Sequence, residues 1–216
     1  MKIKKVVDLS MPITIDTPIY PGEPKPVIYP AATIESDGFN VSQLNIGSHT
    51  GTHVDAPYHF NKMGLKIDEV GITSFLGTGL VLNVTGKEPG APITLDDIRP
   101  YLDQLTPGII ALFHTGWSNF AKEELYYTHP YVSIEVIEEM LARGIRTFLI
   151  DTLNIDPPDA TSFAGHDAIT KINGIIGENI TNIEAIDFAN PFIITLPLRL
   201  QGLDGSPVRA VAVEFE

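Results

Sequence analysis

Short apolar runs alternate with amphipathic stretches along the 216 residues, and this alternation restricts the possible folds more than any other feature of the sequence. Ser133 to Arg143 is the clearest helix, because Ile134, Ile137 and Leu141 form one apolar stripe that ends before Gly144. Six runs are short and apolar enough to be strands: 41–46, 80–84, 109–113, 146–150, 192–198 and 208–215. Strands interleaved with helices predict an α/β fold, a layered domain with a mixed β-sheet and flanking helices.

The length and composition indicate a single domain over residues 1–216. Hydrophobic residues make up 44% of the chain, which is enough for a packed core. Five prolines between Pro18 and Pro30 exclude a regular helix there and predict an extended arm over about residues 18–30. This arm is expected to lie either against the rest of the domain or against a neighbouring subunit.

The charge of the chain limits its partners. It carries 14 Lys and Arg against 27 Asp and Glu, a formal net charge of -13. Such a protein repels nucleic-acid phosphates and anionic lipid, so neither a nucleic acid nor a membrane is expected as a partner. The N-terminal residues lack the apolar region of a signal peptide, so we expect a cytoplasmic protein. Cysteine is absent, which excludes disulfides, thiolate metal sites and cysteine nucleophiles.

Three of the six histidines lie within eleven residues. His49, His53, Asp55 and His59 together offer the imidazole and carboxylate ligands that suit a divalent metal. A hydrogen-bonded structural role is the ordinary explanation for a single histidine. Four ligand-type side chains around a glycine turn favour a metal site instead.

Neither a helix nor a strand can gather these four side chains around one ion. Four residues of extended chain cover roughly 13 Å, too far for two ligands that each lie about 2 Å from a metal. A helix would place His49 and His53 together but would turn Asp55 away from them. We therefore expect a loop that bends at Gly51 and Pro57.

A site formed by His49, His53 and Asp55 would leave coordination positions open, as catalytic metals require. His59 is either a fourth ligand or the group that moves protons during the reaction. Asp55 has two oxygens and can bridge to a second ion if further ligands arrive from elsewhere in the chain.

The segment from His49 to Phe60 fits the pattern His-x-Gly-Thr-His-x-Asp-x-Pro-x-His-Phe. It resembles the signature of the metal-dependent cyclase-like hydrolases, a family that includes bacterial kynurenine formamidase (arylformamidase) and isatin hydrolase. The resemblance extends to Tyr20-Pro-Gly-Glu23, to His114-Thr-Gly-Trp117, and to His166 with Glu178-Asn179. The kynurenine formamidases usually carry Trp and Asp at the positions of Tyr20 and Glu23.

The resemblance implies one or two divalent ions per subunit, with zinc expected first and manganese as the alternative. A first ion would be held by His49, His53 and Asp55, and a second by Asp55, His166 and Glu178. His59 would be the proton donor and acceptor, and Tyr20 would line the substrate pocket.

By the same resemblance we expect the swivelling β/β/α fold of the cyclase-like hydrolases, a homodimer or homotetramer, and a small-molecule substrate. The expected reaction is hydrolysis of the C–N amide bond of a small aryl formamide such as N-formylkynurenine, a step of tryptophan catabolism, by metal-activated water. One alternative is an enzyme that opens a cyclic amide such as isatin, or that catalyses a cyclase or dehydratase reaction. Another is a non-catalytic metal-binding protein.

Two acids follow the expected strand 146–150. Asp151 is expected either to cap the end of this strand or to support a metal-bound histidine, since such histidines usually donate to a carboxylate or a carbonyl. Asp156 is expected to begin a proline turn, and His129 to lie in an exposed loop. His114 is expected either to face the pocket or to be a satisfied core residue.

Overall fold

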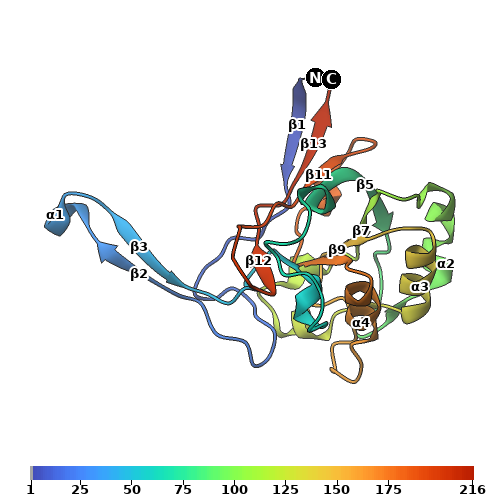
Figure 1. Cartoon of the computed structure of the whole chain (residues 1–216), viewed down its shortest axis with the longest axis horizontal. Coiled ribbons are helices and arrows are strands. Elements are labelled where there is room, and N and C mark those ends of the chain that lie inside the picture. The colour runs from blue at the N-terminus through green and yellow to red at the C-terminus, as the bar shows by residue number, and fades with distance from the viewer. Residues whose placement is uncertain (1) are drawn as a thin grey trace.

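The computed structural model describes residues 2–216 and contains a nine-stranded mixed sheet with helices packed against it (Figure 1). The strands are β1 (Ile3–Asp8), β2 (Val27–Ala32), β3 (Val41–Asn45), β4 (His53–Asp55), β5 (Leu76–Asn83), β6 (Pro92–Ile93), β7 (Ile110–His114), β8 (Tyr131–Val132), β9 (Thr147–Ile150), β10 (Ile175–Glu178), β11 (Phe192–Ile194), β12 (Gly205–Pro207) and β13 (Val211–Phe215). The helices are α1 (Ile34–Asp37), α2 (Leu95–Ile98), α3 (Ile134–Ala142) and α4 (Ala164–Lys171). This confirms the expected α/β fold with a mixed sheet and flanking helices. None of the helices in residues 2–216 has the length and apolar character needed to cross a membrane.

The strands of the large sheet lie in the order β1-β13-β11-β5-β7-β9-β10-β4-β12. The middle strands β5, β7, β9 and β10 are parallel to one another. The strands on both sides of them pair antiparallel, and β2 with β3 and β6 with β8 form two smaller sheets. Strand β4, from the first part of the chain, pairs antiparallel with both β10 and β12, from its last third.

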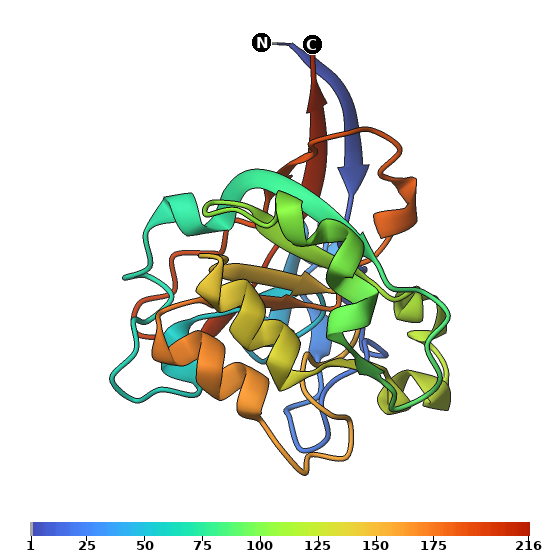
Figure 2. The same cartoon turned by 90° about the vertical axis from the view of Figure 1, so that its right-hand side faces the viewer.

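Helices α2, α3 and α4 cover one face of the sheet (Figure 2). Phe113 of β7 packs on that side with Ile137 and Met140 of α3, and all three are fully buried. Its neighbour Leu112 faces the other side, where it packs in a second cluster with Leu9. Strand β7 is therefore buried on both faces, which explains the uninterrupted apolar run that precedes His114.

Three strands differ by more than one residue from the expected runs, and one of them, β13, begins at Val211 rather than at residue 208. Strand β5 begins at Leu76, four residues before the run 80–84, despite the glycines in between. A Cβ at Gly79 would lie 2.5 Å from Cγ1 of Ile193, so glycine leaves the space that this side chain occupies. Strand β11 ends at Ile194 rather than at residue 198. The remaining part of the expected run contains Pro197, which has no N–H to donate to a ladder.

Strands β2 and β3 form a hairpin that projects from the body of the molecule (Figure 1). The proline-rich segment leads into it through a turn at Gly22, where φ is 99°. The end of this segment forms strand β2, and the projecting arm continues to Asn45 in β3. Its apolar side chains face solvent: Val27, Tyr29 and Phe39 are 48%, 52% and 57% exposed.

Candidate metal centre and active site

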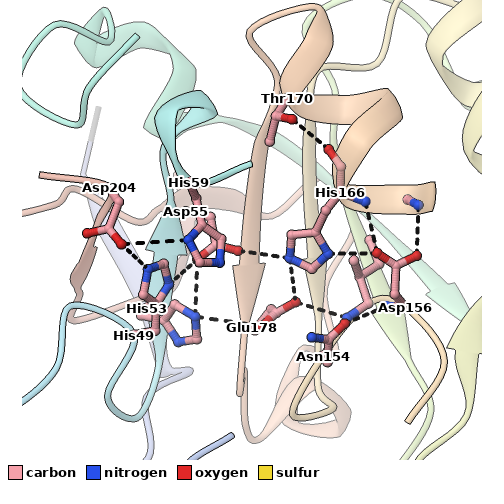
Figure 3. Close-up of polar contacts among 12 residues, drawn as sticks. His49, His53, Asp55, His59, Asn154, Asp156, His166, Thr170, Glu178 and Asp204 are labelled. Carbon is pink, nitrogen blue, oxygen red and sulfur yellow. Dashed lines mark hydrogen bonds and ion pairs between the residues drawn. The ribbon is translucent and has the colours of Figure 1, made fainter. Parts of the chain in front are cut away.

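Strand β4 carries two of the expected ligand residues on one face. His53 and Asp55 are two positions apart, so their side chains leave the strand on the same side, and His53 Nε2 lies 3.2 Å from Asp55 Oδ1. Pairing with β10 sets Glu178 opposite His53, with Glu178 Oε2 at 3.6 Å from His53 Nε2 (Figure 3). The sequence predicted a loop at this point. A short strand holds these donors instead, because a spacing of two residues suits a strand where a spacing of four does not.

The chain bends on both sides of β4, at the two predicted residues. Gly51 has a φ of 67°, a conformation that favours glycine, and the bend returns His49 so that its Nδ1 donates to Asp55 Oδ1 at 2.6 Å. A single 3-10 turn, Pro57–His59, brings His59 to the same place. The His59 and His49 rings lie 4.0 Å apart between centroids.

Helix α4 adds His166 from a distant part of the chain. Its Nε2 lies 3.4 Å from Asp55 Oδ2 and 3.7 Å from Glu178 Oε1. Glu178 is held in turn, because its Oε1 accepts from the Ile155 N–H at 2.9 Å. The structure therefore brings together all the residues that the resemblance joined. Their roles as metal ligands stay a prediction.

Two of the histidines have one ring nitrogen fixed by a neighbour. His53 Nδ1 donates to the Gly51 carbonyl at 2.8 Å, and His166 Nδ1 donates to Asp156 Oδ2 at 2.7 Å. An N–H fixed at Nδ1 leaves Nε2 free to bind a metal, and outer hydrogen bonds of this kind orient metal-bound histidines. Asp156 also accepts from the backbone N–H groups of Gly165 and His166, at the start of α4.

This arrangement decides one open alternative and corrects two predictions. Of the two roles expected for Asp151, it does not support a metal-site histidine, since its carboxylate accepts from Thr115 and Gly116. Asp156, expected only to begin a turn, contacts His166 instead. His129 is 1% exposed rather than in an exposed loop.

The residues of the cluster fit a divalent cation. Asp55 is 1% exposed, and within residues 2–216 its Oδ2 has no hydrogen-bond partner. A buried carboxylate oxygen without a partner is costly, and a bound cation would satisfy it. Donor atoms lie within 4.8 Å of one another in each of two groups. The first group is His49, Asp55 and His59, and the second is His53, Asp55 and Glu178. Because both groups contain Asp55, the geometry suits one ion or two that share this carboxylate. Nitrogen and carboxylate donors suit borderline divalent metals.

The charges of the cluster depend on one another. Burial alone would lower the pKa of His49, but Asp55 and Asp204 outweigh it and raise this pKa to about 11. Burial likewise opposes a charge on His166, but its hydrogen bond to Asp156 and its contact with the Asp55 carboxylate raise its pKa to about 10. Burial and the charge of Asp55 raise the pKa of Glu178 to about 7. Without metal, protonated histidines balance the carboxylates, and a divalent cation would replace those protons.

A cavity of about 160 Å³ opens beside His49, His53, His59, His166 and Glu178. Its wall includes Tyr20, Glu23, Phe60, Leu153, Phe163 and Asn179. Tyr20 is thus part of the wall of this cavity, and its role in substrate binding stays a prediction. Its ring packs on the cluster of Trp117, Tyr126 and Leu153, and the Tyr126 hydroxyl donates to Asn179 Oδ1 at 2.6 Å. The cavity thus combines aromatic walls with a polar floor of imidazoles and carboxylates.

Asp204 completes the cluster and was missed by the sequence analysis. Its Oδ1 accepts from Ser48 Oγ at 2.9 Å, and its Oδ2 lies 3.1 Å from His49 Nε2 and 3.6 Å from His59 Nδ1. These contacts hold the pKa of Asp204 well below its usual range, with the hydrogen bond from His49 as the largest cause. A lone acid in a C-terminal loop, 155 residues away from His49, carries no local signal of such a role.

Comparison with known proteins gives three findings. Residues 7–157 match the family model Cyclase. Kynurenine formamidase of Bacillus anthracis is 30% identical over 213 residues, which cover 98% of each chain. Among solved structures, an isatin hydrolase bound to the product analogue thioisatinate superposes with a TM-score of 0.91 at 22% identity, over 98% of this chain and 93% of the other. A potential metal-dependent hydrolase with cyclase activity superposes with a TM-score of 0.81 at 24% identity, over 98% of both chains.

Proposed function

The chain belongs to the cyclase family, and on that premise we propose that it is a metal-dependent hydrolase that cleaves the C–N amide bond of a small aryl formamide such as N-formylkynurenine. The full-length similarity to kynurenine formamidases supports this substrate class and a place in tryptophan catabolism. The observation that carries the proposal is the convergence of three imidazoles on the Asp55 carboxylate, with Glu178 beside them, at the floor of an aromatic-walled cavity.

His49, His53, Asp55, His166 and Glu178 would hold one or two divalent ions, zinc in the first place and manganese as the alternative. Such an ion supplies a water of lowered pKa and polarises the substrate carbonyl. Every donor comes from an element whose position is fixed by pairing or by hydrogen bonds, which suits a site that must keep its geometry during catalysis.

His59 is suited to move the proton. Its side chain is 27% exposed, against 9% for His49, and it lines the cavity beside the buried donors. In hydrolysis, His59 would accept a proton as the water oxygen bonds to the formyl carbon. It would then donate that proton to the nitrogen as the C–N bond breaks, which yields formate and the aryl amine. The rings of Phe60 and Phe163, 5.3 Å apart, would pack against the aryl group.

One observation favours a second substrate class. The cavity of about 160 Å³ lies below the range of about 300–1,000 Å³ that holds drug-sized ligands, so a compact cyclic amide such as isatin would fit it well. The same residues would open the ring, and the leaving nitrogen would stay attached to the product. A cyclase or dehydratase reaction would use the same site. A non-catalytic metal-binding role would not account for a cavity beside the cluster.

The test is a turnover assay of the zinc-loaded protein on N-formylkynurenine, formanilide and isatin. His59→Ala should lower turnover roughly 10²- to 10⁴-fold with metal content unchanged. His114→Ala is a matched control, because His114 faces Glu184 at 4.0 Å and does not line the cavity. A fully loaded protein without activity on any of these amides would overturn the proposal, and loss of metal from His59→Ala would make His59 a ligand instead.

We also propose a homodimer or homotetramer in the cytoplasm. The β2–β3 hairpin supports self-association, since a two-stranded hairpin that packs on nothing is marginally stable in water. Its exposed Val27, Tyr29 and Phe39 are the kind of surface that a second subunit would cover.

A further inference from the structure

Asp204 occupies a position that the proposed chemistry has not yet used. Its Oδ2 lies 3.1 Å from His49 Nε2 and 3.6 Å from His59 Nδ1 (Figure 3). Its Oδ1 accepts from Ser48 Oγ at 2.9 Å. Asp204 therefore touches both a predicted ligand and the predicted proton-transfer residue.

The sheet fixes this carboxylate relative to the metal centre. Asp204 precedes β12, in which Gly205 is paired with Asp55 of β4. The Asp204 carbonyl accepts from the Ala56 N–H at 2.8 Å, on the other side of Asp55. A Cβ at Gly205 would lie 2.8 Å from Cε1 of His49, so a residue without a side chain is needed where the strand meets the imidazole. Asp204 and Asp55 thus sit in one rigid frame.

The two histidines depend on Asp204 to different degrees. His49 is already oriented by the 2.6 Å contact of its Nδ1 with Asp55. His59 has no such second contact: in residues 2–216, Asp204 is the only acid within 4.0 Å of its ring nitrogens, and no hydrogen bond fixes its ring. The orientation and tautomer of His59 are therefore open to control by Asp204.

We propose that Asp204 is a positioning residue for His59: it accepts the Nδ1–H, so that Nε2 faces the cavity as the proton acceptor. The inference rests on the proposed function. A distance of 3.6 Å is longer than a hydrogen bond, and catalytic contacts of free enzymes commonly shorten when substrate binds. The same logic of a carboxylate that selects a histidine tautomer operates in the Ser-His-Asp triad.

The effect should be smaller than in a buried triad. The side chains of Asp204 and His59 are 37% and 27% exposed, so water competes with their contact. We expect Asp204→Asn to lower kcat about 10- to 100-fold, with KM changed less than about twofold, because the residue acts through His59 and not on the substrate. Asp68→Asn is the matched control. The Asp68 carboxylate accepts from the N–H of Gly202, which lies in the same loop as Asp204, and it touches no histidine of the described chain.

Three measurements on the zinc-loaded protein test the proposal. Elemental analysis should find full metal content in Asp204→Asn. In the His59→Ala background, Asp204→Asn should lower kcat no further, because its effect requires the imidazole. Nitrogen-15 NMR of His59 at about pH 8 should show the Nδ1–H tautomer in the wild type and in Asp68→Asn, and a shift towards the Nε2–H tautomer in Asp204→Asn.

An unchanged His59 tautomer in Asp204→Asn would overturn the proposal. Loss of metal would also overturn it and would show that Asp204 acts through His49. If the wild type hydrolyses none of the amides, the proposed function fails, and the tautomer measurement still decides whether Asp204 orients His59.

Discussion

Asp156 contacts His166 from outside the proposed metal centre, and its replacement tests how that centre is built. The carboxylate is 2% exposed. It accepts three hydrogen bonds, from Gly165 N at 2.7 Å, His166 N at 2.9 Å and His166 Nδ1 at 2.7 Å. In Asp156→Asn the side chain loses its charge, and an NH₂ group replaces one of the two oxygens that accept these hydrogen bonds. One or two of these N–H groups must then go without an acceptor.

The structure sets the size of the effect. Each buried donor left unsatisfied costs about 1–3 kcal/mol, and the lost charge at the start of α4 costs about 0.3–1 kcal/mol. We therefore expect Asp156→Asn to destabilise the metal-free protein by about 3 kcal/mol, or roughly 6–12 °C in Tm for a chain of this size. Since His166 loses the partner that fixes its ring, metal affinity should also fall about 10- to 100-fold.

Thermal unfolding of the metal-free protein and competition with a chelator measure these two effects separately. Asp167→Asn is the control, because Asp167 lies in the same first turn of α4 but is exposed and accepts no side-chain hydrogen bond in the described chain. Its cost should stay below about 1 kcal/mol, with metal affinity unchanged. If Asp156→Asn is destabilised but binds metal as tightly as the wild type, Asp156 only caps the helix and the reasoning about His166 is wrong.

Three further predictions address other parts of the molecule. Gly205→Ala would place a Cβ 2.8 Å from His49 Cε1 and should lower the free energy of unfolding by about 1–3 kcal/mol through overpacking. It should also weaken zinc binding in a chelator titration. Unaltered binding would mean that His49 does not need this close approach. Burial lowers the pKa of His129 from 6.5 to about 4, so the stability conferred by its neutral ring is complete above pH 6.5 and is lost as the pH falls towards 4. In His129→Asn, up to about 3 kcal/mol of this loss of stability at low pH should disappear. Urea unfolding of both proteins between pH 4 and 7 tests this, and parallel curves of unfolding free energy against pH would contradict it. Replacement of residues 28–44 by a short glycine-serine turn should yield monomers in sedimentation, whereas a wild type that is already monomeric would refute the role of the hairpin.

The parts of the fold that could be predicted are those whose cause is local. The run 109–113 is apolar at every position because β7 is buried on both faces, and this is visible without knowing its neighbours. The stripe of Ile134, Ile137 and Leu141 likewise predicts α3. The bends at Gly51 and Pro57 followed from the reach of a ligand set, a constraint that holds in any fold.

The rest depends on contacts between distant segments. Strands β4, β10 and β12 have three or four residues each, and only pairing with neighbouring strands makes them strands. Asp156 and Asp204 acquire their roles from histidines 10 and 155 positions away. His166 and Glu178 were found through the resemblance alone, because one lies in a helix and the other ends a strand with nothing local to mark it.

The metal centre and the cavity wall are built by different parts of the chain. His53, Asp55 and Glu178 are set by the register of β4 and β10, so a change in any surrounding loop leaves their spacing intact. Tyr20 comes from the loop before the hairpin and Phe163 from the loop before α4, and neither takes part in the pairing of the large sheet. Loop changes can therefore reshape the cavity around an unchanged centre. If the proposed function is correct, the wall of the cavity and not the proposed metal ligands would set the choice between a formamide and a cyclic amide.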